Sequence, residues 1–494
     1  MRYEDAFGNI NFTLMLSGKP DASTSGDMAT QTLSAHIPML FHPQPKTVMV
    51  LGYASGVTAG ETLCYPIEKL DILEISPDVV VASKFFNPWN SNVLSNPATE
   101  LIVQDGRAHL QLTTRKYDVI ISEPSNPWMA GLAVLFTQDF FELAKEKLNI
   151  GGIFTQFFHS YQMNWYTFAM VCRSFAAVFP NNALVQTGPG DYLLLGFKSF
   201  TGIEFSNLQR NITFAQNSKN IRIPDAKTLY RLVKTENLAH LAGKGTANTD
   251  NFPTLEFAAP KNMFLDDPDI EKNIETINQF TPETQQMKQE VESSVDLQLD
   301  FLEFSLSVNI DDLGMVDLSR ATDAQRQRFF KLVESYCVNH EIEYDLIKDD
   351  LLKSRCLSLQ LSSLENRLEK NKNKLTVHYA LSALYRQKGD LSNACLHYSK
   401  ILQINPDDII THGRLALALA ALGKIDEAIE QCRIVLKARP DDAEMHTNLG
   451  ILLQQQGKLD EAIESYRKAL QINPAFQKAL DHLSSALAQK QKLR

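Results

Sequence analysis

The stretch KYDVIISEPSNPWMAG, residues 116–131, decides the fold that the sequence predicts. Its first part, 117–121, is a mostly apolar, β-branched run typical of a buried strand. The run ends abruptly in SEPSNPW, which puts a carboxylate, an amide and two prolines directly after the strand. Two interpretations fit such an ending: an ordinary rigid turn, or the floor of an active site.

The sequence around this stretch, 46–200, alternates strand and helix signals. An amphipathic helix pattern over 137–152 ends in two glycines. The strand-like runs are 46–51, 69–74, 100–103, 117–121, 152–158 and 191–198. This alternation predicts an α/β Rossmann-like, doubly wound parallel sheet, whose ligands bind beyond the carboxyl ends of the strands.

Three more polar clusters follow strand-like runs in this region. They are the glycine loop from Gly52 to Gly56, the carboxylate Glu74, and the pair Asp105-Gly106. Each has an ordinary alternative, respectively a chain-turning loop, a solvent-exposed acid and an Asp-Gly turn. Because the carboxyl ends of parallel strands meet at one edge of a sheet, four clusters at four strand ends together predict one ligand site.

The C-terminal part of the chain is built from repeats. Gly, Ala and Pro each recur at intervals of 34 residues, at Gly389, Gly423, Gly457, Ala394, Ala428, Ala462, Pro406, Pro440 and Pro474. Glycine permits the tight turn between two helices, alanine lets them approach closely, and proline cannot continue a helix. The pattern resembles tetratricopeptide repeats at 375–408, 409–442 and 443–476, followed by a capping helix. Such repeats form a concave groove, so we expect a protein or peptide partner there.

One histidine also recurs in each repeat, at His378, His412 and His446. A ladder of metal ions is one interpretation of this spacing. The successive histidines belong to different helix pairs and have no carboxylate partners, so we predict packed or groove-lining side chains instead. The sequence predicts no metal site.

The bulk composition narrows the class of protein. The chain has 494 residues, of which 44% are hydrophobic and 21% charged, and its net charge of −10 argues against a nucleic-acid partner. Its six cysteines are scattered without a C-x-x-C pair, which is typical of a reducing compartment. No apolar run is long enough to span a membrane and no signal-peptide pattern is present, so a cytoplasmic location is predicted.

Four regions are predicted along the chain. Residues 1–45 form a short N-terminal β element and an entry helix, and 46–262 form the Rossmann-like domain. Residues 263–374 form a helical linking region, and 375–494 form the three repeats and the capping helix. Only 9–16 has a strand pattern before Gly18, and this short N-terminal sheet is a hint that the natural gene begins upstream.

The order of the motifs resembles the spermidine synthase family of aminopropyltransferases. The motifs are the glycine loop, LEIS, QDGRAHL, YDVIISEPSNP and LFTQDFFELAKEKLNIGGIF, preceded by an entry segment over 17–46. The likeness covers about 14–200, and 248–260 looks like a closing segment. The resemblance implies a methyltransferase-type Rossmann fold, decarboxylated S-adenosylmethionine as co-substrate, and a role in polyamine biosynthesis.

By this resemblance, one group of residues binds the donor. Glu74 would hold the ribose hydroxyls, and Asp105 with Gly106 would bind the adenine. The loop would face the sulfonium side chain through Gly52, Ser55 and Gly56.

A second group of residues faces the small amine acceptor. Gln31 lies where the family lines its amine channel, Glu123 where it has a proton-accepting Asp, and Asn126 where a second Asp grips the amine. A primary amine is mostly protonated at neutral pH, with a pKa of about 10, so a neighbouring carboxylate is needed to accept the proton.

Three positions depart from the family pattern and keep other functions open. Ser55 and Asn126 replace aspartates, and Glu123 replaces the catalytic Asp. An uncharged Ser55 suits ordinary S-adenosylmethionine, whose carboxylate an Asp would repel, and this favours a methyltransferase. A catalytically inactive nucleoside-binding scaffold is the third alternative. The acceptor, the partner of the repeats and a homo-oligomeric state stay open.

Overall fold

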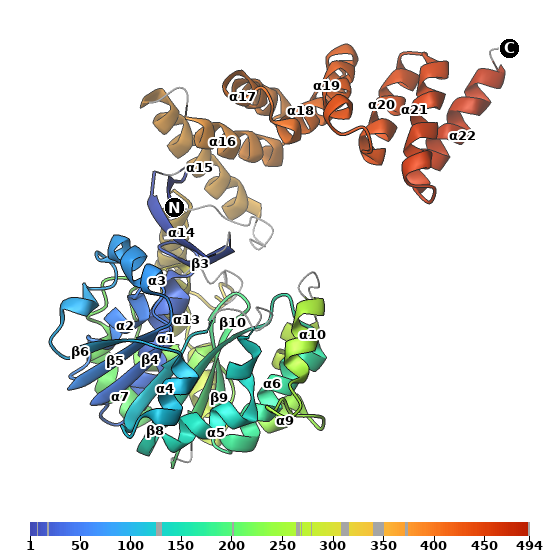
Figure 1. Ribbon diagram of the computed structural model, residues 1–494. Helices are drawn as coiled ribbons and strands as arrows, with labels where there is room; N and C mark the ends of the chain where they lie inside the picture. The colour runs from blue at the N-terminus through green and yellow to red at the C-terminus, as the bar shows by residue number, and fades with distance from the viewer. Residues whose placement is uncertain are drawn as a thin grey trace. The chain divides into compact units, whose positions relative to one another are not determined.

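The computed structural model describes residues 1–6, 8–16, 19–124, 131–199, 202–262, 267, 269–277, 279–307, 316–338, 350–370 and 374–492. The chain divides into two compact units (Figure 1). The first comprises Met1–Tyr3 and Ile10–Leu332, and the second Glu4–Asn9 and Val333–Arg494. The four region boundaries predicted from the sequence stay predictions.

An eight-stranded sheet forms the centre of the first unit. Its strand order is β11-β9-β10-β8-β7-β4-β5-β6. The strands β4 to β8 run parallel, whereas β10 is antiparallel to both of its neighbours. The strands are β4 Thr47–Leu51, β5 Lys69–Glu74, β6 Thr99–Val103, β7 Tyr117–Ser122, β8 Leu148–His159, β9 Asn182–Gly188, β10 Asp191–Phe197 and β11 Val233–Thr235. This order and the antiparallel β10 confirm the predicted methyltransferase-type Rossmann-like fold.

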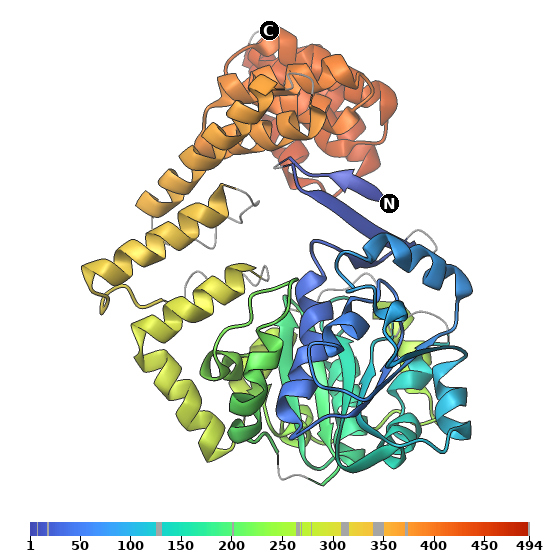
Figure 2. The same ribbon diagram turned by 90° about the vertical axis from the view of Figure 1, so that its left-hand side faces the viewer.

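Helices cover both faces of this sheet (Figures 1 and 2). On one face, α1 (Met28–Phe41) and α7 (Phe205–Ala215) pack over side chains such as Val48 and Val50. On the other face, α5 (Gln138–Glu146) and α6 (Trp165–Val178) pack over Met49 and its neighbours. Strands buried on both faces explain why the sequence shows continuous apolar runs instead of alternation.

The remaining elements of the first unit are short helices and a small N-terminal sheet. The helices are α2 Val57–Thr62, α3 Pro77–Ala82, η1 Ser83–Phe86, η2 Val93–Ser95, α4 Gly106–Leu112, η3 Ala133–Phe136, α8 Ala226–Leu229, η4 Tyr230–Leu232, α9 Leu238–Ala242, α10 Thr254–Asn262, α11 Asp269–Ile277, α12 Pro282–Ser293 and α13 Val295–Ser307. The small sheet contains β1 Arg2–Glu4, β2 Ile10–Leu16 and β3 Lys19–Ser23.

Three expectations about these elements were wrong. Two strands, β1 and β2, precede residue 18 where one was expected, because β1 is exposed throughout and has no apolar pattern. The helix expected over 137–152 ends at Glu146, and β8 already begins at Leu148. Gly151, with φ +81°, lies where the register of β7 and β8 shifts, so it belongs to a bulge and not to a helix end. No strand was predicted over β9 or β11.

The second unit is helical. From Val333 it contains the end of α14 (Asp323–Cys337). The helices after α14 are α15 Asp350–Lys370, α16 Leu375–Lys388, α17 Leu391–Ile404, α18 Ile409–Ala421, α19 Ile425–Ala438, α20 Ala443–Gln455, α21 Leu459–Ile472 and α22 Gln477–Lys492. The helices from α16 to α21 form three antiparallel pairs. Gly389, Gly423 and Gly457 all have φ between +75° and +82°, as the turn inside each repeat requires. The tetratricopeptide architecture is thus confirmed.

The recurring histidines have local structural roles. His412 Nε2 and His446 Nε2 each bond the carbonyl oxygen of the proline six residues earlier, at 3.0 Å. His378 Nδ1 lies 3.0 Å from His397 Nδ1 inside the first repeat. No helix in the described part of the chain is both long and apolar enough to cross a membrane.

Candidate active site

The register of the sheet brings the predicted site residues to one edge. Leu51, the last residue of β4, pairs with Leu73 of β5 and with Ser122 of β7. The next residue along each strand is therefore Gly52, Glu74 and Glu123. Backbone bonds extend the ladder by one step, since the Gly52 N–H donates to Leu73 and the Glu123 N–H donates to Leu51.

A cavity of about 590 Å³ opens at this edge. It lies between the ends of the parallel strands, the loop after β4, α1 and β3. Its lining residues are Pro20, Asp21, Ala22, Gly26, Asp27, Thr30, Gln31, Gly52, Tyr53, Ala54, Ser55, Thr58, Glu123, Pro124, Phe157, Tyr161, Gln162, Pro189 and Asp191. A cavity of about 660 Å³ elsewhere in the unit is lined by both acidic and basic side chains of 218–225 and α13, away from the strand ends.

Four carboxylates line the first cavity: Asp21, Asp27, Glu123 and Asp191. Among its described lining residues there is no Lys, Arg or His. Sequence reasoning selected only Glu123 of these four. Asp191 could have been found from its place at the start of a strand. Because β10 is antiparallel, its first residue lies at the edge where the parallel strands end. Asp191 pairs with His159, the last residue of β8.

Burial makes three of these carboxyl groups weaker acids by raising their pKa values. It raises the pKa of Glu123 to about 7, and the charge of Asp21 adds to the effect. It raises the pKa of Asp191 to about 6, with a further contribution from Asp27. Burial also raises the pKa of Asp27 itself. Near-neutral carboxyl groups can exchange protons at physiological pH, and a bound cation would restore their ionised form.

The glycine loop fits tightly against the turn that carries Glu123. Gly52 has φ +94°, and a Cβ atom there would lie 2.7 Å from the Glu123 carbonyl oxygen. Gly56 has φ +80°, and a Cβ atom there would lie 2.5 Å from the Tyr53 ring. Both positions therefore require glycine for sterics and for backbone conformation. Gly52 lines the cavity, whereas Gly56 begins α2.

Gln31 and Ser55, predicted separately, meet at the cavity wall. The Ser55 hydroxyl donates to Gln31 Oε1, and Gln31 Nε2 donates to the Ser23 carbonyl oxygen at 2.9 Å. The Thr58 hydroxyl donates to the Gln31 carbonyl oxygen at 2.8 Å. These bonds hold the side chain of Gln31 in the wall of the cavity that Glu123 also lines.

Glu74, Asp105 and Gly106 lie further along the strand edge and do not line this cavity. Glu74 Oε2 accepts from the Tyr53 N–H at 3.1 Å, and its Oε1 accepts from the Ser76 N–H at 2.9 Å. Asp105 Oδ1 accepts from the Ala108 N–H at 2.7 Å and so caps α4. The residues predicted to bind the nucleoside thus lie at the ends of neighbouring strands. Asn126 lies outside the described residues.

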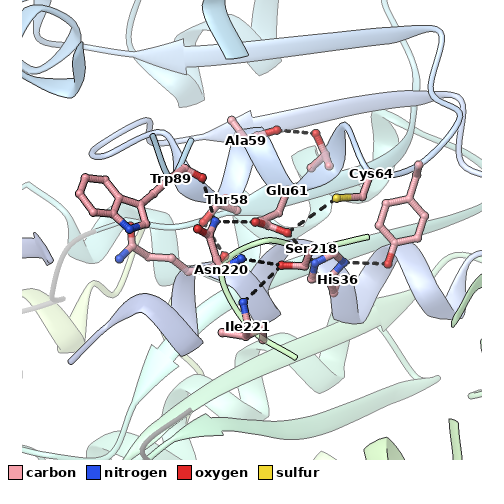
Figure 3. A network of polar contacts seen from close by, with 12 residues as sticks. His36, Thr58, Ala59, Glu61, Cys64, Trp89, Ser218, Asn220 and Ile221 are labelled. Atoms are coloured by element: carbon pink, nitrogen blue, oxygen red, sulfur yellow. Dashed lines mark hydrogen bonds and ion pairs between the residues drawn. The ribbon is translucent and has the colours of Figure 1, made fainter. Parts of the chain in front are cut away.

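A buried polar network joins α1 to α2 (Figure 3). His36 Nε2 bonds Glu61 Oε2 at 2.8 Å, and His36 Nδ1 bonds the Tyr65 hydroxyl at 2.9 Å. Asn220 Nδ2 donates to Glu61 Oε1 at 2.5 Å. His36, Glu61 and Cys64 form the group of described residues whose atoms, all within 4.8 Å, could hold a metal ion. Because these groups already bond one another, we interpret the network as the support that fixes α2 against α1.

Comparison with known proteins finds one family match in the N-terminal half of the chain and two near its C-terminal end. Residues 28–200 match the family described as the spermine/spermidine synthase domain. Residues 375–408 and 414–475 match tetratricopeptide repeat families. The match to the first family begins at the first residue of α1 and ends after β10.

Individual relatives share about a third of their residues over the matched part. Thermospermine synthase ACAULIS5 from Arabidopsis thaliana is 32% identical over 151 residues, which cover 30% of this chain and 44% of that one. Spermidine synthase from Dictyostelium discoideum is 33% identical over 149 residues, which cover 30% and 51%. The chain thus spans about half the length of the curated relatives it matches.

A solved structure is also similar. The spermidine synthase from Thermotoga maritima superimposes with a TM-score of 0.37 at 19% sequence identity, covering 52% of this chain and 81% of that one. The assignment of the fold rests on the strand order and not on this superposition.

Proposed function

Because the chain carries a spermidine synthase-type domain ahead of tetratricopeptide repeats, we propose that it transfers an aminopropyl group from decarboxylated S-adenosylmethionine to a small amine. The observation that carries the proposal is the acidic cavity. Four carboxylates face one space in which no described lining residue is cationic. Such a site stabilises a ligand with more than one positive charge, as a polyamine has.

Glu123 is the proposed general base. Its carboxylate follows β7 at the cavity wall, and burial raises its pKa to about 7, close to the pH at which it would act. The donor supplies a carbon bound to a positively charged sulfur, which is already a good leaving group. The protein must then hold the acceptor nitrogen in line and remove its proton, which passes to Glu123 as the new C–N bond forms and the C–S bond breaks.

The other acids and the amide of Gln31 orient the acceptor in this proposal. Asp191 accepts a hydrogen bond from the Thr30 hydroxyl at 2.8 Å, which fixes its carboxylate at the wall. Asp21 and Asp27 supply negative charge from β3 and from the residue before α1. In this proposal the three acids supply negative charge that the family pattern carries at two other positions. Those positions are Ser55 and Asn126 in this chain, which are uncharged.

Glu74, Asp105 and Gly106 are proposed to bind the nucleoside half of the donor. Gly52, Ser55 and Gly56 would face its side chain. The proposal is supported by Gly52 and Ser55, which line the acidic cavity, and by the bond from the Tyr53 N–H, also in its lining, to Glu74. Asn126 stays a proposed contact to the amine. We also infer that the repeats bind a protein or peptide, and a cytoplasmic location stays a prediction.

One observation favours a methyltransferase as the second candidate. Ser55 is uncharged and bonds Gln31, so the loop itself would not repel the carboxylate of ordinary S-adenosylmethionine. The acidic cavity opposes this alternative, because four carboxylates would repel the carboxylate of that donor. The inactive scaffold is the remaining alternative.

Calorimetry with three nucleosides separates the candidates. The purified full chain is titrated with S-adenosylmethionine, its decarboxylated form and methylthioadenosine, and then assayed for putrescine turnover. We expect selective binding of the decarboxylated donor together with turnover. Tighter binding of the carboxylated donor, with methyl transfer, would support the methyltransferase. Nucleoside binding without either transfer would support the inactive nucleoside-binding scaffold, and failure to bind any nucleoside would leave only a scaffold that acts through its repeats.

A further inference from the structure

The helix that follows Asp105 has little support of its own. Helix α4 contains seven residues, Gly106 to Leu112, and Leu110 is its buried side chain. Two turns of isolated helix are unstable in water, so neighbouring segments must fix the position of α4. The first turn matters most, because Asp105 and Gly106 are the proposed adenine-binding residues.

An ion pair from a distant segment holds this first turn. Arg107 donates through Nη1 to Asp250 Oδ1 at 3.1 Å and through Nη2 to Oδ2. Arg107 Nη1 also donates to the Val134 carbonyl oxygen at 3.0 Å. The planar guanidinium thus connects α4 to η3 and to Asp250 at the same time. A two-point pair of this kind fixes orientation better than a single charge contact does.

The segment that carries Asp250 is itself firmly anchored. Asn248 is fully buried, and all of its polar groups are bonded. Its N–H donates to the Ser174 hydroxyl at 2.7 Å, and its Oδ1 accepts from the Leu255 N–H at 3.0 Å. Its Nδ2 donates to the Phe136 carbonyl oxygen at 3.2 Å, and its own carbonyl oxygen accepts from the Gln138 N–H at 2.8 Å.

The same segment also contacts Gly131 and the residue that caps α5. Glu256 Oε1 accepts from the Gly131 N–H at 3.3 Å. Gly131 is the first described residue after Pro124. The Thr137 hydroxyl donates to Asp250 Oδ1 at 2.8 Å and also caps α5. Residues 248–256 therefore bond the first turn of α4, Gly131 and the Thr137 side chain.

We propose that residues 248–256, which we call the clamp, position the adenine-binding turn at Asp105 and Gly106 through the Arg107–Asp250 pair. Arg107 and Asp250 are positioning residues, and their effect is on donor affinity and not on proton transfer. The inference rests on the proposed function, because it takes the nucleoside to bind beside Asp105.

Two variants of the pair test the proposal. Asp250→Asn removes the carboxylate that pairs with Arg107, and Arg107→Lys keeps the positive charge but loses the two-point geometry. Glu290→Gln is the matched control, since Glu290 pairs with Lys227 at 2.6 Å elsewhere in the unit. Glu290 and Asp250 side chains are similarly exposed, at 36% and 38%.

We expect the dissociation constant of methylthioadenosine, measured by calorimetry, to rise about tenfold in both pair variants. The control should match the wild type. The KM for the amine at saturating donor should change less than about twofold, which a general loss of structure would not allow. Unchanged nucleoside affinity in folded Asp250→Asn and Arg107→Lys would overturn the proposal while leaving the proposed function intact.

Hydrogen exchange of the free protein provides a readout that does not depend on any ligand. Amides of 106–112 should exchange faster in Asp250→Asn than in Glu290→Gln, because the first turn loses its anchor. If exchange there is unchanged, the clamp does not fix α4, whatever the protein binds. If the wild type binds no nucleoside, the proposed function fails, and with it the part of the inference that concerns adenine.

Discussion

Two groups of carboxylates lie along the same sheet edge, and their surroundings differ. In the cavity, the half-buried Glu123 and Asp191 lie beside other acids, and loss of solvent raises the pKa of each. Along β5 and β6, Glu74 accepts hydrogen bonds from the N–H groups of Tyr53, in the loop after β4, and of Ser76, and Asp105 accepts one from the Ala108 N–H. The first group thus concentrates negative charge around the cavity. The second group holds the backbone of nearby loops in place by accepting hydrogen bonds from it.

This difference separates two kinds of ligand. Clustered acids with raised pKa values gain most from a cation, because a positive charge restores their ionised form. Acids bonded to the backbone hold loops in a set shape and offer their remaining lone pairs to neutral donors such as hydroxyl groups. We therefore expect changes in the cavity to affect the amine and its proton, and changes along β5 and β6 to affect the nucleoside.

The largest effect is expected for Glu123→Gln. An amide cannot accept the amine proton, so kcat with putrescine should fall at least about a hundredfold. The dissociation constant of methylthioadenosine should change less than about twofold. Glu142→Gln, an exposed change on α5, is the control. Full turnover in Glu123→Gln would assign the base to another residue and remove the main contrast between the two groups.

The sequence predicted the parallel half of the fold well because its physical signals are local. Strands buried on both faces are apolar runs, and each ends at or just before a polar residue or a glycine. Two short strands outside the parallel part of the sheet, β11 and β1, were harder to predict. Strand β11, Val233–Thr235, has three residues, and the exposed β1 has no pattern for burial to impose.

The site was predictable where its residues belong to one motif. Glu123 and the loop at Gly52 follow strands that the sequence marks clearly. Asp21 and Asp191 come from β3 and from the antiparallel β10, and only folding places them opposite Glu123. No local pattern connects positions so far apart in the chain. The bond between Gln31 and Ser55 likewise depends on how α1 packs against α2.

Asp191→Asn is expected to have the second largest effect. The amide keeps an acceptor for the Thr30 hydroxyl, so local structure should persist, but one negative charge is lost. A charged hydrogen bond to the amine is worth enough to raise its KM about thirtyfold. Steady-state kinetics at saturating donor measure this change, with Asp78→Asn on the exposed face of α3 as the control. An unchanged KM would mean that the acceptor does not reach this wall.

Glu74→Gln tests the other group and should act on the nucleoside. The amide keeps one oxygen, so it can retain only one of the two bonds to the Tyr53 and Ser76 N–H groups. We expect the dissociation constant of methylthioadenosine to rise about tenfold, with the amine KM unchanged. If the amine KM rose instead, the separation between cavity and strand edge would be wrong.

The pH dependence of kcat/KM gives the smallest and sharpest test. The base must be ionised, and the raised pKa of Glu123, about 7, means that activity increases as pH rises through this value. From pH 7 to pH 8 the ionised fraction, and so kcat/KM, should increase about twofold. Asp21→Asn removes a negative charge that raises this pKa, so the rise should shift to lower pH. Glu142→Gln should leave the profile in place, and a rise that stays at the same pH in Asp21→Asn would show that another group controls it.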